Sequence, residues 1–185
     1  MREKIASLVR AIEPHDPREA ADQDWTLAWI ASGAPLFRIK KPDQPDKHLV
    51  CYCVVFDVDR RKVLLGNHRI AGRLLPSGGH VEPDEDPDLG APRELHEELG
   101  ISVPQLFQGP LFITVTKTVG AVAGGHFDVS LWYVFRGDTS SAIGHDSGEF
   151  DGVDWFALDA IPFSRCDPEM RRFTDKLQDK LRLLA

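Results

Sequence analysis

The segment that most constrains this chain of 185 residues runs from Pro76 to Ile101 and reads PSGGHVEPDEDPDLGAPRELHEELGI. Near its start, the run Pro-Ser-Gly-Gly predicts a tight turn after a short strand. Its paired glycines also let the backbone approach a ligand or an ion closely. Asp86 and Pro87 then stand in the order of an N-cap and a proline at the first helical position, which predicts a helix.

The predicted helix carries three glutamates on one face. Glu94, Glu97 and Glu98 are spaced i, i+3 and i+4, so their carboxylates lie close together and repel one another. A glutamate-rich helix usually has a solvated acidic face, but Leu95 and Leu99 form a core-packing stripe beside this one. We therefore expect a docked helix whose acidic edge borders a cleft. Such an all-oxygen cluster suits a hard divalent cation that bridges to phosphates, namely Mg²⁺, with Mn²⁺ as the alternative.

The whole segment resembles the signature of the Nudix hydrolases, G-x5-E-x7-R-E-U-x-E-E-x-G-U, in which U is a bulky aliphatic residue. Every defined position matches, namely Gly79, Glu85, Arg93, Glu94, Leu95, Glu97, Glu98, Gly100 and Ile101. So many positions at fixed spacing make the pattern specific. The resemblance implies an enzyme that cleaves a phosphoanhydride bond with water and depends on magnesium. It also implies an α/β/α sandwich with a mixed sheet.

The resemblance also implies roles for individual residues. The metal ligands would be Glu94, Glu97, Glu98 and the backbone carbonyl of Gly78. Arg93 and Glu85 would pair with each other and hold the loop against the helix. One departure from a regular helix is Pro92, which loses a backbone hydrogen bond and crowds the carbonyl of residue 88. Either the helix kinks there, or its regular part begins later than Pro87.

The resemblance suggests two candidates for the base that activates water. The family often adds a carboxylate from a later loop, a few residues before a strand tryptophan. Glu149, which precedes Trp155, fits this place, and Asp151 and Asp154 are weaker candidates. Family members differ over whether the base is this loop residue or a glutamate of the signature. We favour Glu149, followed by Glu94; the predicted catalytic set is Glu94, Glu149, Glu98, Arg93 and Glu85.

Three further residues are candidates for binding the substrate. Arg69 precedes the glycine pair and is the best candidate for a phosphate contact. Apolar and polar residues alternate from Phe127 to Phe135, which predicts a strand with one buried face. Asp128 and Trp132 lie on the other, polar face of this strand. They are therefore candidates for reading a nucleobase or stacking on it.

The rest of the chain predicts an α/β fold with an N-terminal helical extension. Predicted helices are Ile5–Ile12, Asp16–Ser32 and one capped at Asp167 that runs to Leu184; predicted strands are Leu49–Val58, Val63–Leu65, Leu111–Thr118, Phe127–Phe135 and Val153–Leu158. Helices and strands interleave without strict βαβ order, which favours a mixed sheet between helices. Residues 1–45, which include most of the linker 40–47, have no counterpart in the minimal Nudix fold. Residues 46–185 are the predicted hydrolase domain.

Charge and composition narrow the classes of partner. The net charge of −7 argues against a nucleic-acid polymer, which needs a basic footprint. No apolar run is long enough to cross a bilayer, and the first residues lack a signal-peptide core, so we expect a cytoplasmic protein.

Cys51 and Cys53 are expected to pack as reduced thiols on one buried strand face. Trp25 and Trp29 share a helix face and should pack on the core, with a homodimer contact or a lid as the alternative.

The substrate is predicted from marks that are missing downstream of the signature. Proteins that resemble ADP-ribose hydrolases carry a proline where Thr116 and Lys117 stand, and diadenosine-polyphosphate hydrolases carry a tyrosine near Thr118 and Val119. This favours a nucleoside triphosphate cleaved to a monophosphate and pyrophosphate. A nucleotide-sugar, ADP-ribose or a dinucleotide is the alternative. Isoprenoid diphosphate isomerases use a catalytic cysteine, and non-catalytic sensors tend to lose signature glutamates. Because the signature is intact here, both classes are less favoured alternatives.

Overall fold

A computed structural model of the chain describes residues 1–40, 44–118 and 125–183. The chain divides into two compact units. The first comprises Met1–Tyr52, Gly78–Ala91 and Gly109–Tyr133, and the second comprises Cys53–Ser77, Pro92–Gln108 and Val134–Ala185. Strand β1 (Lys47–Asp57), helix α3 (Pro87–Leu99) and strand β6 (His126–Arg136) each contribute residues to both units. Of the sequence predictions, residues 41–43 of the linker, Val119 and Leu184 lie outside the described residues.

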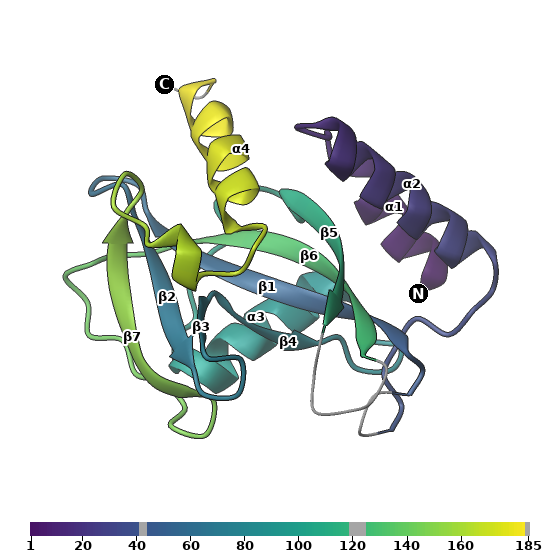
Figure 1. Cartoon of the computed structure of the whole chain (residues 1–185), viewed down its shortest axis with the longest axis horizontal. Helices are drawn as coiled ribbons and strands as arrows, with labels where there is room; N and C mark the ends of the chain where they lie inside the picture. Colours follow the sequence, from purple (N-terminus) through teal and green to yellow (C-terminus); the bar gives the residue numbers. More distant parts are fainter. Residues whose placement is uncertain (41–43, 119–124, 184–185) are drawn as a thin grey trace. The chain divides into compact units, whose positions relative to one another are not determined.

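The chain begins with two helices of the first unit, α1 (Arg2–Ala11) and α2 (Pro17–Ala31), which lie side by side in Figure 1. The predicted start of α2 is confirmed, because the Asp16 side chain accepts a hydrogen bond from the Glu19 amide at 2.8 Å and Pro17 takes the first helical position. Arg2 donates from Nη1 to the carbonyl of Ile30 at 2.7 Å. A local capping signal therefore starts α2, and a side-chain hydrogen bond joins α1 to the end of α2.

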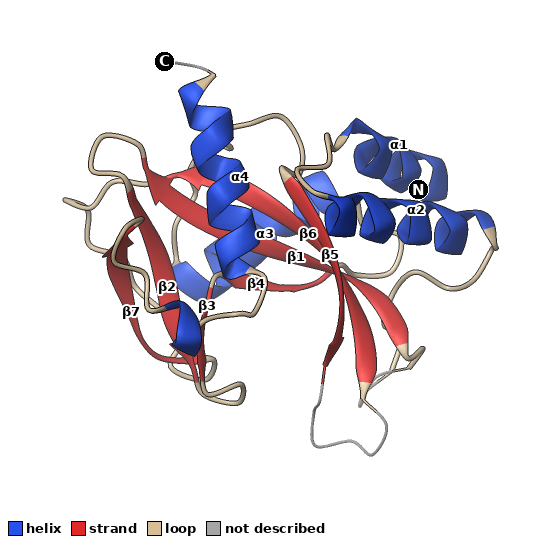
Figure 2. Ribbon diagram, turned by 45° about the horizontal axis from the view of Figure 1, so that its top comes forward, coloured by secondary structure: helices blue, strands red, loops and turns tan. Residues whose placement is uncertain are grey.

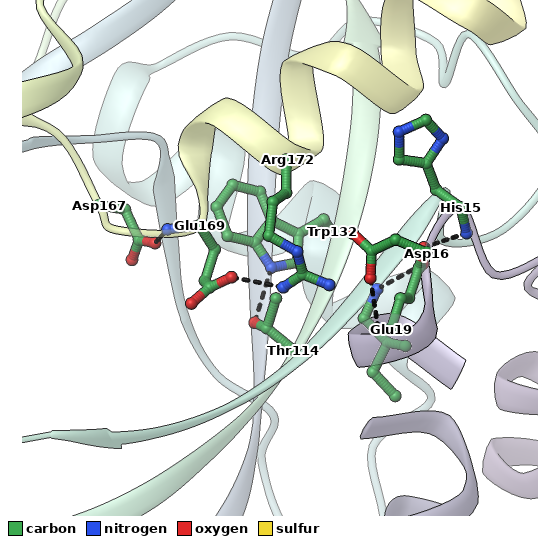
Figure 3. Close-up of polar contacts among 9 residues, drawn as sticks. His15, Asp16, Glu19, Thr114, Trp132, Asp167, Glu169 and Arg172 are labelled. Carbon is green, nitrogen blue, oxygen red and sulfur yellow. Dashed lines mark hydrogen bonds and ion pairs between the residues drawn. The ribbon is translucent and has the colours of Figure 1, made fainter. Parts of the chain in front are cut away.

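A buried carboxylate connects α2 to the sheet. Glu19 is fully buried, and its Oε2 accepts a hydrogen bond from the His15 amide at 2.7 Å, as drawn in Figure 3. Its Oε1 accepts from the Ile113 amide at 3.3 Å, on strand β5 (Phe112–Thr118). Because a buried carboxylate needs such donors, Glu19 fixes α2 against β5.

The two tryptophans of α2 differ in exposure. Trp29 is buried, which confirms its predicted core packing, whereas Trp25 is 38% exposed. The Trp25 ring stacks on Trp29 with centroids 6.0 Å apart and on Phe127 with centroids 6.5 Å apart. Trp25 therefore covers the edge of the core; a lid or dimer role for this pair stays a prediction.

The strands form a sheet in the hydrogen-bonded order β3-β2-β1-β6-β5, and the α/β class is confirmed (Figure 2). In the first unit, β5 pairs antiparallel with β6, with Thr114 opposite Ser130. In the second unit, β2 (Lys62–His68) pairs antiparallel with β3 (Arg73–Leu75) and β7 (Phe150–Ala157). No described helix is long and apolar enough to span a membrane.

The predicted glycine turn is wrong, because Ser77–His80 is a strand, β4, that pairs with β1. Gly78 has φ +148°, and a Cβ there would lie 2.1 Å from the carbonyl oxygen of Cys51 on β1. Glycine is therefore required at this position by the close approach of a neighbouring strand.

The predicted polar face of β6 is also wrong. From Val129 to Phe135 every residue of β6 is buried, on both faces of the strand. The strand lies between β1 and β5 in the sheet, so it is a central strand rather than one with a solvated face. Period-two alternation predicted the strand itself but could not predict what covers its second face.

The C-terminal helix α4 (Met170–Arg182) of the second unit begins later than the predicted cap at Asp167. Asp167 instead closes a turn before the helix, since its Oδ1 accepts from the Glu169 amide at 2.7 Å and its carbonyl accepts from the Met170 amide at 3.0 Å. Arg172 bonds to the buried Glu169, the N-cap residue (Figure 3). The short helix η1 (Phe163–Arg165) precedes this turn.

Candidate active site

Helix α3 begins at Pro87, as predicted. The Asp86 carboxylate accepts a hydrogen bond from the Asp88 amide at 3.1 Å, and the Asp86 carbonyl accepts from the Gly90 amide at 2.8 Å. Pro92 lies inside the helix, so the alternative of a later start is wrong. An ion pair between Asp86 and Lys4 of α1 fixes the N-terminal helices to the first turn of α3.

Glu85 organises the loop that enters α3. Its Oε2 accepts a hydrogen bond from the Glu82 amide at 2.9 Å. The same oxygen lies over Gly90, where a Cβ would approach it to 2.8 Å. Gly90 therefore leaves room for the Glu85 carboxylate at the first turn of the helix, which explains a glycine in a position that otherwise weakens a helix.

The acidic edge of α3 has the predicted relation to the core. Leu95 and Leu99 are buried, while Glu97 is exposed and Glu94 retains 13% exposure of its side chain. The carboxylates therefore stand at the rim of a packed helix, where hard oxygen ligands can meet a hydrated ion.

Arg93 lies between two of the three glutamates. Its Nη1 donates to Glu94 Oε1 at 2.8 Å and to Glu97 Oε2 at 3.0 Å. Among the residues that the structure describes, the carboxylates of Glu94, Glu97 and Glu98 do not all lie within 4.8 Å of one another. An ion shared by all three glutamates therefore requires at least one of these side chains to change its conformation. The predicted pair of Arg93 with Glu85 stays a prediction.

The loop that carries Glu149 is fixed to the same helix. The Asp146 amide donates to the carbonyl of Glu98 at 2.7 Å, and the Glu149 amide donates to the carbonyl of Asp146 at 3.1 Å. The Glu149 side chain is 44% exposed, and its Oε2 lies 3.6 Å from His68 Nε2. A water-accessible carboxylate is thus held on a loop that is hydrogen-bonded to the last turn of α3.

Arg69 belongs to this loop region of the second unit. Its amide donates to the Glu149 carbonyl at 2.9 Å, and its Nη1 donates to the Ser147 carbonyl at 2.9 Å. Its Nε lies 3.5 Å from a carboxylate oxygen of Asp151, and both side chains are about half exposed. Arg69 is accessible to a phosphate, with part of its charge offset by Asp151. Asp154, the other weak candidate, is exposed on β7.

The predicted base-binding residues do not present a free polar face. Trp132 is fully buried, and its indole N–H donates to Thr114 Oγ1 at 3.0 Å (Figure 3). Its ring packs edge-on against Tyr52, with centroids 4.6 Å apart. The prediction that Trp132 stacks on a nucleobase is therefore wrong. Asp128 lies within 3.2 Å of the imidazoles of His48 and His126, a cluster that the sequence predictions missed. Its only sequence signal is the spacing of His126 and Asp128, which share a strand face.

The three cysteines are buried free thiols, which confirms the predicted burial of Cys51 and Cys53. Cys51 and Cys53 lie within β1 and are 0% and 1% exposed. Burial raises the pKa of the Cys166 thiol to about 11. A nucleophilic cysteine needs an exposed thiolate, so these environments argue against the isomerase chemistry.

A model of the NUDIX domain matches residues 46–177. The chain belongs to the Nudix family. This match confirms the family indicated by the signature segment, and the α/β fold agrees with it.

Two Nudix structures share this fold. The MutT NUDIX hydrolase from Burkholderia pseudomallei has a TM-score of 0.54 and 22% identity over 69% of this chain and 95% of its own. The MutT protein from Methanosarcina mazei Go1 has a TM-score of 0.54 and 20% identity over 71% of this chain and 93% of its own.

A curated mouse protein, diphosphoinositol polyphosphate phosphohydrolase 3-alpha, is 33% identical over 64 residues. These residues are 35% of this chain and 39% of the mouse protein, so the likeness spans well under half of either.

Proposed function

We propose that this Nudix protein is a divalent-metal-dependent hydrolase that cleaves a phosphoanhydride bond in a nucleoside diphosphate linked to a further group. The first candidate substrate is a nucleoside triphosphate, cleaved to a monophosphate and pyrophosphate. The observation that carries the proposal is the acidic edge of α3, which is hydrogen-bonded through Asp146 and Glu98 to the loop that presents Glu149.

Glu94, Glu97 and Glu98 are the proposed ligands of Mg²⁺, or of Mn²⁺ in its place. Their donor set fits such an ion, because it consists of carboxylate oxygens at a solvated helix edge and contains no sulfur or nitrogen. When bound, the metal neutralises phosphate charge and orients the attacking water. The carbonyl of Gly78 is an additional ligand implied by the family resemblance.

Arg93 is proposed as a positioning residue. Its guanidinium bonds to Glu94 and Glu97, so it offsets the repulsion between two like charges and limits their side-chain conformations. Glu85 has a similar task at the entrance of the helix, where it closes the turn at Glu82.

Glu149 is the proposed general base, with Glu94 as the alternative. A general base needs a carboxylate that reaches water, and Glu149 is half exposed on a loop whose backbone is fixed by Asp146 and Arg69. His68, 3.6 Å from Glu149 Oε2, limits the orientation of this carboxylate.

Changing Glu149 to glutamine should lower kcat by about 10²–10⁴-fold and change KM much less, because the loss falls on proton transfer in the transition state. Steady-state kinetics at saturating Mg²⁺ measure both constants. Asp159→Asn, an exposed carboxylate beyond β7, is the matched control and should leave kcat unchanged. Wild-type turnover by Glu149→Gln, together with an inactive Glu94→Gln, would place the base on α3.

Arg69 is the proposed phosphate contact, since it is half exposed and lies beside Glu149 in the turn that follows β2. One accessible arginine that shares its charge with Asp151 favours a substrate with few phosphates. A diphosphoinositol polyphosphate is the second candidate, on the strength of the mouse relative. It carries more negative charge, which the net charge of −7 does not favour.

A substrate panel with Mg²⁺, scored by its products, tests the proposal. It should contain nucleoside triphosphates, a nucleotide-sugar, ADP-ribose, a dinucleotide and a diphosphoinositol polyphosphate. We expect fastest turnover of a triphosphate, with release of pyrophosphate. If another member is turned over fast and triphosphates are barely cleaved, the substrate assignment is wrong but the proposed hydrolase activity is supported. No turnover of any member would count against the hydrolase itself.

A further inference from the structure

The first unit contains a cluster of three histidines and one aspartate that the proposed reaction does not use. His48 comes from the start of β1, His80 from the end of β4, and His126 and Asp128 from the start of β6. The strands that carry them belong to one sheet. Backbone pairing therefore brings together residues that lie far apart in the sequence.

The four side chains converge through specific atoms. Asp128 Oδ1 lies 3.1 Å from His48 Nε2 and 3.2 Å from His126 Nε2. His80 Nε2 lies 3.0 Å from His48 Nε2. Ligand atoms of His48, His126 and Asp128 all lie within 4.8 Å of one another. The side chain of His48 is fully buried, so this convergence is not a chance meeting of mobile surface groups.

One ring nitrogen of His48 faces the backbone. Its Nδ1 lies 3.1 Å from the carbonyl of Pro45, so Nε2 is the nitrogen that faces the carboxylate of Asp128. Asp128 Oδ1 is buried and has no hydrogen-bond partner, although two imidazole nitrogens are near. A buried oxygen in that state is costly unless a donor or a cation satisfies it.

The spacing of the donor atoms matches that of a transition-metal site. Bonds of about 2.0–2.2 Å from zinc to nitrogen and oxygen place neighbouring ligands of a tetrahedral site about 3.3 Å apart. The distances from Asp128 Oδ1 to Nε2 of His48 and to Nε2 of His126, 3.1 and 3.2 Å, are close to this value. The contact of His48 Nδ1 with a backbone carbonyl is also the support that metal-binding histidines usually have.

The ring of His48 lies close to both other imidazoles of the cluster. Its centroid is 4.7 Å from that of His80. The His48 and His126 rings stack with centroids 5.0 Å apart.

We propose that His48, His126 and Asp128 bind one Zn²⁺ ion. Two imidazoles and one carboxylate favour Zn²⁺ over Mg²⁺, which takes oxygen ligands. The bound ion would join β1 and β6 within the first unit. Its role there is structural, and its ligands are not the glutamates proposed for the reaction.

The test is a metal titration of the whole protein, stripped with a chelator and exchanged into excess Mg²⁺ so that the glutamates of α3 are saturated. We expect one equivalent of Zn²⁺ to bind and to raise the melting temperature, because the ion binds the folded state. Co²⁺, used as a probe, should give the visible absorption of a four-coordinate site. Asp128→Asn and His126→Ala should each weaken Zn²⁺ binding by at least 100-fold.

Two controls separate this site from other sources of binding. Glu97→Gln on α3 and His145→Ala, an exposed histidine, should retain one equivalent of Zn²⁺ with unchanged affinity. Asp128→Asn nearly preserves side-chain shape, so it decides the matter if His126→Ala does not fold. The proposal is overturned if the wild type binds no stoichiometric Zn²⁺, if Asp128→Asn binds it unchanged, or if only Glu97→Gln abolishes binding.

Discussion

Glu98→Gln should reduce kcat/KM by about 10³-fold or more, because a neutral amide replaces one ligand of a metal that stabilises several kcal/mol of transition-state charge. Glu97→Gln should have a similar effect. The fold should survive in both variants, since removing one of three mutually repelling charges relieves repulsion. At position 97 the amide oxygen can still accept the hydrogen bond from Arg93.

Kinetics over a range of Mg²⁺ concentrations, with thermal melting of each variant, measure this effect. Glu3→Gln is the matched control, because Glu3 is an exposed helix glutamate of α1 that pairs with Arg10. The Glu3→Gln variant should keep the activity and the melting temperature of the wild type. Full activity in excess chelator, or a fully active Glu98→Gln, would refute the metal role of the acidic edge.

Gly78→Ala should destabilise the protein by about 2–6 kcal/mol, the sum of a backbone penalty and an overpacking penalty. The added Cβ would lie 2.1 Å from the Cys51 carbonyl oxygen and 2.9 Å from the Tyr52 Cα, and both are backbone atoms of β1. Neither can move without disturbing the pairing of β4 with β1, and φ of +148° is itself unfavourable for alanine.

Thermal unfolding checks this expectation, and a fall in melting temperature of roughly 5–20 °C corresponds to it for a chain of this size. Gly152→Ala on β7 is the control, because a Cβ at that position meets no atom within 4 Å. If Gly78→Ala melts within about 2 °C of the wild type, the close approach of β4 to β1 is wrong.

Local signals predicted the helices and the acidic edge well. Asp16 and Pro17 start α2 as expected, and α3 begins at Pro87 and buries Leu95 and Leu99. These features depend on neighbours within one or two turns, so the sequence alone carries them. Family membership was predictable for the same reason, because the signature is one continuous segment.

Features that depend on strand pairing were not predictable. Ser77–His80 contains a glycine pair typical of a turn, yet pairing with β1 makes it a strand. Trp132 alternates with apolar residues but is covered on its own face as well. The cluster of His48, His80 and Asp128 requires three strands in register, which no local pattern specifies.

The hydrogen bond from the Ile113 amide to the buried Glu19 carboxylate bears on how this protein can be shortened. The family match begins at residue 46, but the compact unit that contains β5 also contains α1 and α2. Deleting these helices would remove the Glu19 carboxylate from the Ile113 amide and the Trp25 ring from Phe127. We therefore expect a chain trimmed at residue 46 to be less stable than the full chain unless substitutions on β5 compensate for the lost contacts.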